Sequence, residues 1–120
     1  MAAQEQSALT EAVYYILLTL VDPMHGYGIM QRVKVLSDGR VNLGPGTLYG
    51  AINTLLEKGW IQAASSAEEN SRQKAYLITE RGLAVLAREL LRLEELLSHG
   101  REILSEARAH RWPSSEGGVR

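Results

Sequence analysis

The hydrophobic positions near the start of the chain recur with a helical period. They predict a helix from about residue 7 to Val21, capped by Ser7 and ended by Asp22-Pro23. Its main apolar face is expected to consist of Leu9, Val13, Ile16, Leu17 and Leu20. A second apolar set lies nearly opposite: Tyr14, Tyr15 and Leu18. We expect this second side to meet a partner chain or a ligand, unless the tyrosines lie flat on the surface with wet hydroxyls.

Two shorter helices are predicted next. The turn at residues 25–28 opens the first of them, and Ser37-Asp38-Gly39 ends it. After a brief extended piece, Gly44-Pro45 begins the second helix and Gly59 ends it. Its inward stripe is expected to be Leu48, Ile52, Leu55 and Leu56. Two short helices joined in this way form a helix-turn-helix arrangement.

The outer face of the second short helix is unusual for a solvated surface. It carries short or flat hydrogen-bonding residues in place of a Glu/Lys mixture: Thr47, Tyr49, Gly50, Asn53 and Thr54. Such a face can exchange hydrogen bonds with base edges in the major groove of DNA. We therefore predict a DNA recognition helix in which Thr47 and Asn53 reach bases and Tyr49 contacts the backbone. The alternative is a plain surface helix rich in Thr and Asn.

After Gly59 the hydrophobic period changes. Residues 60–65 and 73–78 predict two strands, and the polar loop between them would be the tip of a hairpin. Three helices followed by a hairpin is the order of elements in a winged helix. Arg72 and Lys74 would lie where the hairpin passes the phosphate backbone, although an isolated Arg or Lys on a hairpin is more often only solvated. The complete set of predicted DNA-contacting residues is Tyr27, Thr47, Tyr49, Asn53, Thr54, Arg72 and Lys74.

A long helix is predicted to follow, with Thr79 as its cap. Its apolar positions alternate spacings of four and three, as in a coiled-coil seam: Leu86, Leu90, Leu93, Leu97, Gly100 and Leu104. This seam is longer than a small winged helix could cover, so we predict a homodimer, with a close helix crossing allowed at Gly100. The expected organisation is a winged helix-turn-helix domain over residues 1–82, a dimerisation helix over 83–111 and a disordered tail over 112–120.

The two unpartnered apolar surfaces suggest a ligand site. If they meet across the two-fold axis of the dimer, they form an apolar slot suited to a flat aromatic or hydrophobic effector. The predicted lining is Tyr14, Tyr15, Leu18, Leu86, Leu90, Leu93 and Leu97. The alternative is that these side chains pack the slot shut.

Composition narrows the function classes. The 120 residues are 45% hydrophobic, which fits one folded domain and excludes wholesale disorder. The absence of cysteine excludes disulfides and thiolate chemistry and fits a cytoplasmic location, and the longest apolar run is too short to span a membrane. The three histidines have no evident acidic partners, so we predict no metal site. The sequence also has no carboxylates paired for acid–base chemistry, no Gly-rich phosphate loop and no nucleophile elbow, so we predict no cofactor and no enzymatic activity. The formal charge of -1 means that any basic DNA-binding surface must be local.

Several motifs in order resemble the PadR family of bacterial transcriptional regulators. They are His25-Gly26-Tyr27-Gly28-Ile29, then Gly46-Thr47-Leu48-Tyr49 with Leu55-Leu56-Glu57-Lys58-Gly59, then Tyr76-Leu77-Ile78-Thr79-Glu80-Arg81-Gly82. The chain is similar to the compact subfamily with a single C-terminal helix. The resemblance implies a mainly α-helical, homodimeric winged-helix repressor whose N- and C-terminal helices form the dimer, with release of the DNA by a small molecule. The two-fold symmetry of such a dimer predicts a pseudo-palindromic operator of double-stranded DNA. The chain departs from the family at Gly50, where members commonly have Pro, and in its less basic wing.

A second function class fits the near-neutral charge. A winged helix can serve as a protein interaction and dimerisation module without specific DNA binding. The two readings differ in their response to salt, because phosphate contacts release counterions and a protein interface need not.

Overall fold

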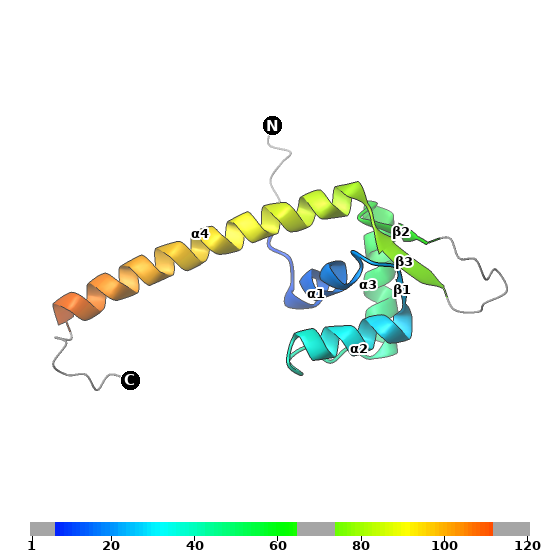
Figure 1. Cartoon of the computed structure of the whole chain (residues 1–120), viewed down its shortest axis with the longest axis horizontal. Coiled ribbons are helices and arrows are strands. Elements are labelled where there is room, and N and C mark those ends of the chain that lie inside the picture. The colour runs from blue at the N-terminus through cyan, green and yellow to red at the C-terminus, as the bar shows by residue number, and fades with distance from the viewer. Residues whose placement is uncertain (1–6, 65–73, 112–120) are drawn as a thin grey trace. The chain divides into compact units, whose positions relative to one another are not determined.

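The computed structural model describes residues 7–64 and 74–111. Within these ranges the elements are α1 (Glu11–Thr19), β1 (Met24–His25), α2 (Gly26–Leu36), α3 (Pro45–Lys58), β2 (Ile61–Ala63), β3 (Ala75–Ile78) and α4 (Glu80–Arg111). The chain divides into two compact units, residues 1–87 and residues 88–120. In the first unit, α1, α2 and α3 gather beside the small sheet (Figure 1). The expected class, mainly helical with a small hairpin and a long C-terminal helix, is confirmed.

The first helix is shorter than the hydrophobic pattern predicts. Its N-cap is Thr10, whose hydroxyl accepts a hydrogen bond from the Val13 amide at 3.1 Å. Glu11 follows in the first turn, where a carboxylate is favoured by the positive end of the helix dipole. The prediction of a cap at Ser7 is therefore wrong, because Thr10 offers the same capping oxygen closer to the acidic first turn.

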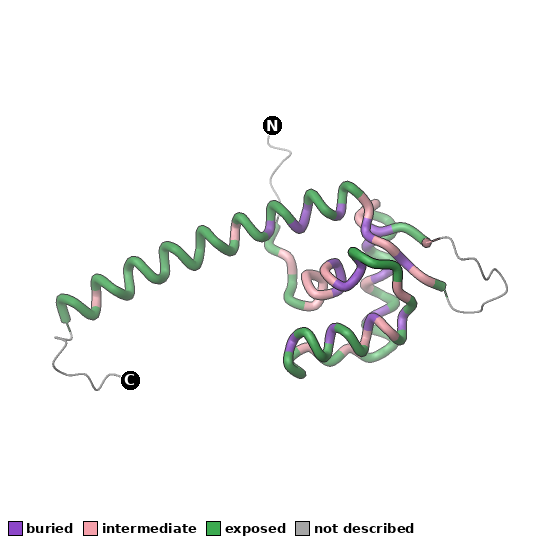
Figure 2. Tube along the Cα trace, viewed as in Figure 1, coloured by how far each residue is buried: buried purple, intermediate pink, exposed green. Residues whose placement is uncertain are grey.

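The core of the first unit takes apolar side chains from all four helices and from two strands. Its buried members are Ile16, Leu17, Leu20, Ile29, Val33, Leu48, Ile52, Leu55, Ile61, Tyr76, Ile78, Val85 and Leu86. Figure 2 shows that the buried residues concentrate in this unit, whereas the chain from residue 88 onward is largely exposed. Val85 and Leu86 belong to the core, so the first unit includes the opening turns of α4 and extends beyond the expected boundary at residue 82. Leu56, expected on the inward stripe of α3, is instead 37% exposed.

The sheet has three antiparallel strands in the order β1-β3-β2. In the predicted hairpin, Ile61 pairs with Ile78 and Ala63 with Tyr76. The strands are shorter than expected, and the connecting loop lies outside the described residues. Strand β1, which pairs Met24 with Tyr76, was not predicted. Two residues are too few to show an alternating pattern, and the turn signal that follows them dominates the sequence there.

A glycine and a threonine fix the start of α4 against the end of α3. Gly59 ends α3 in the left-handed region at a φ of 76°. The Thr79 hydroxyl accepts from the Gly82 amide at 3.1 Å and donates to the Gly59 carbonyl at 2.7 Å. A Cβ at Gly82 would collide with the Trp60 carbonyl oxygen and would lie 2.6 Å from Cγ1 of Ile78. The predicted cap at Thr79 is thus confirmed, and Gly82 permits the close approach that accompanies it.

The described part of the second unit is the remainder of α4. Leu90, Leu91, Leu93, Leu96, Leu97, Ile103 and Leu104 are all at least 38% exposed. Arg92 donates two hydrogen bonds to the buried carboxylate of Glu89, at 3.0 and 2.6 Å. No helix among the described residues is long and apolar enough to cross a membrane.

Candidate nucleic-acid interface

Helices α2 and α3 form the predicted helix-turn-helix. The inner face of α3 is fixed by Leu48, Ile52 and Leu55, none of which is more than 1% exposed. These buried anchors determine which side of α3 faces outward. At the start of α3 the N-cap is Gly44, which has no side chain with which to cap the helix. The first amides of α3 therefore receive no capping bond from Gly44, which suits contact with an anion such as a phosphate.

The outward side of α3 is the polar face that the sequence predicts. Thr47, Tyr49, Gly50, Asn53 and Thr54 are all exposed. A Cβ placed at Gly46 or Gly50 would meet nothing within 4 Å. The two glycines are thus not required by packing within the described residues, and they leave the helix backbone itself accessible on this face.

The side chains of this face differ in the hydrogen bonds that they already form within the chain. Within residues 7–64 and 74–111, Asn53 and Thr47 take part in no side-chain hydrogen bond. Thr54, by contrast, donates its hydroxyl to the Gly50 carbonyl at 3.2 Å. Asn53 and Thr47 therefore keep their full hydrogen-bonding capacity for a partner, and Thr54 keeps mainly its acceptor capacity.

Tyr49 has a second contact that its sequence position does not reveal. Its ring lies over Gly26, where an added Cβ would fall onto the phenol and would lie 2.7 Å from Cζ. Burial raises the pKa of the Tyr76 phenol, and the neighbouring Tyr49 raises it further. Tyr49 thus packs α3 against the start of α2, while it remains 44% exposed. The Tyr49 ring therefore fixes the packing of α3 against α2, and its exposed part remains accessible to a molecule bound on this face.

The remaining predicted DNA contacts lie beside α3 or outside the described residues. Tyr27, on α2, is 66% exposed, and its hydroxyl accepts a hydrogen bond from Nε2 of Gln31 at 2.9 Å. Lys74 is exposed immediately before β3. Arg72 lies outside the described residues, together with the tip of the predicted hairpin.

The near-neutral total charge conceals a local excess of positive charge. Over residues 26–58 the basic residues are Arg32, Lys34, Arg40 and Lys58, and the acidic ones are Asp38 and Glu57. Four positive charges minus two negative charges give a formal +2 for the helix-turn-helix segment, against -1 for the whole chain. The helix-turn-helix segment is therefore more basic than the chain as a whole, although Arg40 pairs with Glu11 outside the segment at 2.9 Å.

The residues of the predicted ligand slot fall into different environments. Tyr14, Tyr15 and Leu18 are partly buried and pack against the core of the first unit. The core of the chain itself therefore covers part of this side of α1, which was expected to meet a partner chain or a ligand. The rings of Tyr14 and Tyr15 also contact each other edge to face, with centroids 5.7 Å apart.

The leucines of the predicted slot are partly buried and partly exposed: one belongs to the core and three face solvent. Leu86 is 6% exposed and belongs to the core, so it is already covered within the chain. Leu90, Leu93 and Leu97 are 45%, 38% and 53% exposed and remain available to a partner. Among the described residues, no group of three or more His, Asp or Glu side chains could hold a metal ion.

Comparison with known proteins places this geometry in a family. The model of the transcriptional regulator PadR-like family matches residues 14–88, which include most of α1, all of α2 and α3, the sheet and the first turns of α4. A 37.1 kDa protein in transposon TN4556 of Streptomyces fradiae is 39% identical over 80 residues. That match covers 66% of this chain but only 22% of the length of the Streptomyces protein.

Solved structures show the same fold. A transcriptional regulator from Clostridium thermocellum has a TM-score of 0.65 at 23% identity, over 76% of this chain and 87% of its own. A PadR-like transcription factor from Bacteroides fragilis has a TM-score of 0.62 at 24% identity, with the same coverage of 76% and 87%. A PadR family transcriptional regulator from Eggerthella lenta has a TM-score of 0.55 at 28% identity, over 77% of this chain and 75% of its own.

Proposed function

Since this chain belongs to the PadR-like family of transcriptional regulators, we propose that it binds duplex DNA sequence-specifically through α3 and represses transcription as a homodimer. The observation that carries the proposal is the outward face of α3. It combines unengaged hydrogen-bonding side chains at Thr47 and Asn53 with an accessible backbone at Gly46 and Gly50. Hydrogen-bonding side chains on the outward face of a recognition helix contact base edges in the major groove.

Different residues of the interface have different roles in this proposal. Asn53 and Thr47 read base edges, since an amide can pair with the N6 and N7 atoms of adenine. Lys74 contacts phosphate, and the first amides of α3 bind another phosphate. Tyr49 contacts the DNA backbone from a position held by Gly26.

The exposed leucines of α4 and the geometry of DNA support the homodimer. A single recognition helix reads one half-site, and a two-fold dimer reads a pseudo-palindrome whose half-sites are about one helical turn apart. Release of the DNA by a hydrophobic ligand in the dimer interface stays a prediction. Leu86 is buried and Tyr14, Tyr15 and Leu18 are partly buried within the chain, so the exposed leucines of α4 would form most of such a slot.

The division between reading and positioning can be tested with two substitutions. Asn53→Ala is expected to relax base preference at one operator position, at a cost of about 1–3 kcal/mol for the preferred base. Lys74→Ala is expected to weaken binding to all sequences alike and to reduce the salt slope by about one. Both are measured by fluorescence anisotropy against a panel of operators that carry single base changes.

Asn42→Ala is the matched control, because Asn42 is also an exposed asparagine but precedes α3. It should leave the affinity for every operator in the panel unchanged. An equal loss for Asn53→Ala on every operator variant would show that Asn53 does not read a base.

A further inference from the structure

A groove on the first unit is separate from the outward face of α3. It is lined by Pro23, Met24, His25, Gly28, Gln31, Arg32, Val35, Leu36 and Ala75. These residues come from β1 and the residue before it, from α2 and from the start of β3, and none comes from α3. The groove has a volume of about 770 Å³ and is open to solvent, which is in the range of a small-molecule site.

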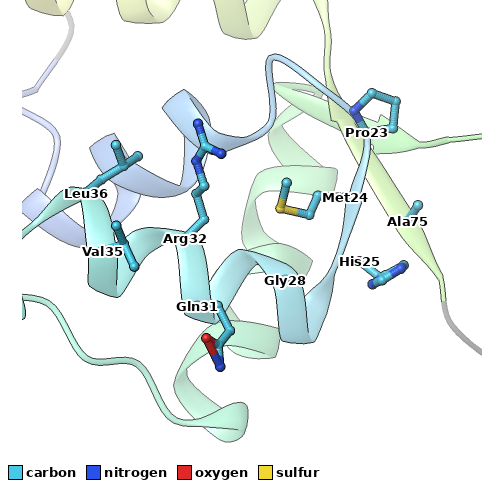
Figure 3. A pocket seen from close by; sticks show the side chains of 9 residues that line it. All are labelled: Pro23, Met24, His25, Gly28, Gln31, Arg32, Val35, Leu36 and Ala75. Carbon is cyan, nitrogen blue, oxygen red and sulfur yellow. The ribbon is translucent and has the colours of Figure 1, made fainter.

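One side of α2 packs against the core, and another side forms a wall of the groove. Gly26, Ile29 and Val33 are buried toward the core. Gly28, Gln31, Arg32 and Val35 lie on another side of the helix and form one wall of the groove. Figure 3 shows Arg32 on this α2 wall, His25 and Ala75 on the strand side, and Met24 between the two. A Cβ at Gly28 would lie 2.9 Å from Cγ of Met24, so the glycine lets Met24 occupy the floor.

The apolar part of the groove is exposed in the folded chain. Val35 is 73% exposed and Leu36 is 43% exposed, and both line the groove. An aromatic or aliphatic body that covered them would gain about 25 cal/mol for each Å² of apolar surface removed from water.

The titratable residues that line the groove are basic ones. Arg32 lines it together with His25, and no Asp or Glu does. Among the described residues Arg32 forms neither an ion pair nor a side-chain hydrogen bond. Its guanidinium is thus available to an anionic group, and a carboxylate matches its planar fork of donors.

We propose that this groove between α2 and the β1–β3 edge is a binding site for a small organic acid with an apolar body, whose carboxylate pairs with Arg32. The apolar body covers Val35, Leu36 and Met24. The inference does not depend on the proposed DNA binding, because occupancy of the groove can be measured with no DNA present.

Naphthalene-2-carboxylate and its uncharged counterpart 2-naphthol are the probes that test it. They share a flat bicyclic body and differ in charge. Titration of the ¹⁵N-labelled full chain, followed by amide chemical shifts, should place the carboxylate probe at Gly28, Gln31, Arg32 and Val35. The carboxylate should bind about two- to fivefold more tightly than the naphthol, as expected for one solvent-accessible ion pair.

Two substitutions in the groove and one outside it complete the experiment. Arg32→Gln should remove the preference for the carboxylate. Val35→Glu should abolish binding of the carboxylate probe, and its exposed position makes the fold tolerant of the change. Lys34→Gln is the control, since Lys34 is an exposed cation on the same helix that does not line the groove. It should leave both affinities unchanged.

Three results would overturn the proposal. The first is equal affinity for the two probes in the wild-type chain. The second is a preference for the carboxylate that survives Arg32→Gln. The third is a set of shifts confined to the exposed leucines of α4, which would place the probes on that surface instead.

Discussion

Three glycines among the described residues lie in close contact with another residue. A side chain at Gly26 would meet the ring of Tyr49, one at Gly28 would meet Met24, and one at Gly82 would meet the Trp60 carbonyl. Each therefore allows two elements to approach more closely than an alanine would permit. The interface depends on this packing, because Tyr49 lies on α3 and Gly26 begins α2.

Gly82→Ala is expected to destabilise the fold. The added methyl group would collide with backbone, which cannot move as easily as a flexible side chain, so the free energy of unfolding should fall by about 1–3 kcal/mol. Urea denaturation followed by circular dichroism measures the change.

Gly50→Ala is the control, because nothing in the described chain lies within 4 Å of its added Cβ and Gly50 lies outside the proposed dimer interface. It should raise helix stability by up to about 1 kcal/mol. A Gly82→Ala protein as resistant to urea as the wild type would contradict the packing argument.

The exposed residues of α3 could be predicted from sequence, but their contacts could not. Periodicity identifies Leu48, Ile52 and Leu55 as inward and therefore Thr47 and Asn53 as outward. The contact between Tyr49 and Gly26 depends on the crossing of α2 and α3, and no local pattern encodes that crossing. The groove beside Arg32 escaped prediction for the same reason, since its walls come from segments about fifty residues apart.

Among the elements, the long helices were easier to predict than the short strands. Residues 45–58 and 80–111 carry enough turns for their period, caps and stop signals to agree. Strand β1 has only two residues, and its pairing with β3 is created by the fold of the whole domain. The start of α1 was misplaced because Ser7 and Thr10 are both acceptable caps by composition, and only the structure distinguishes them.

The leucines of α4 test the homodimer. Leu97→Glu would place a charge within the proposed dimer interface, at a position that is 53% exposed in the isolated chain. The dissociation constant of the dimer should rise by at least roughly tenfold, since burying an unpaired charge easily costs the 1.4 kcal/mol that corresponds to that factor. Sedimentation velocity over a range of concentrations measures it.

Glu95→Lys changes the charge of an exposed residue on a different side of the same helix and serves as the control. It should leave the dimer intact. If Leu97→Glu and Glu95→Lys behave alike, the leucine face of α4 is not the interface.

For the molecule as a whole, the distribution of charge matters more than its sum. The chain carries a formal charge of -1, yet the helix-turn-helix segment over residues 26–58 carries +2. The total charge alone could not distinguish the two functions, because it averages over residues that face different partners.

The most direct test of the central claim is equilibrium binding to DNA across a series of salt concentrations. The full chain first selects duplexes from a random pool, and binding to the enriched duplex is then compared with a scrambled duplex of the same composition. We expect a pseudo-palindrome, tighter binding than to the scrambled duplex, and an affinity that falls with salt by a logarithmic slope of about -0.9 for each phosphate contacted. Failure to enrich any sequence, or equal binding to both duplexes, would contradict specific recognition by α3.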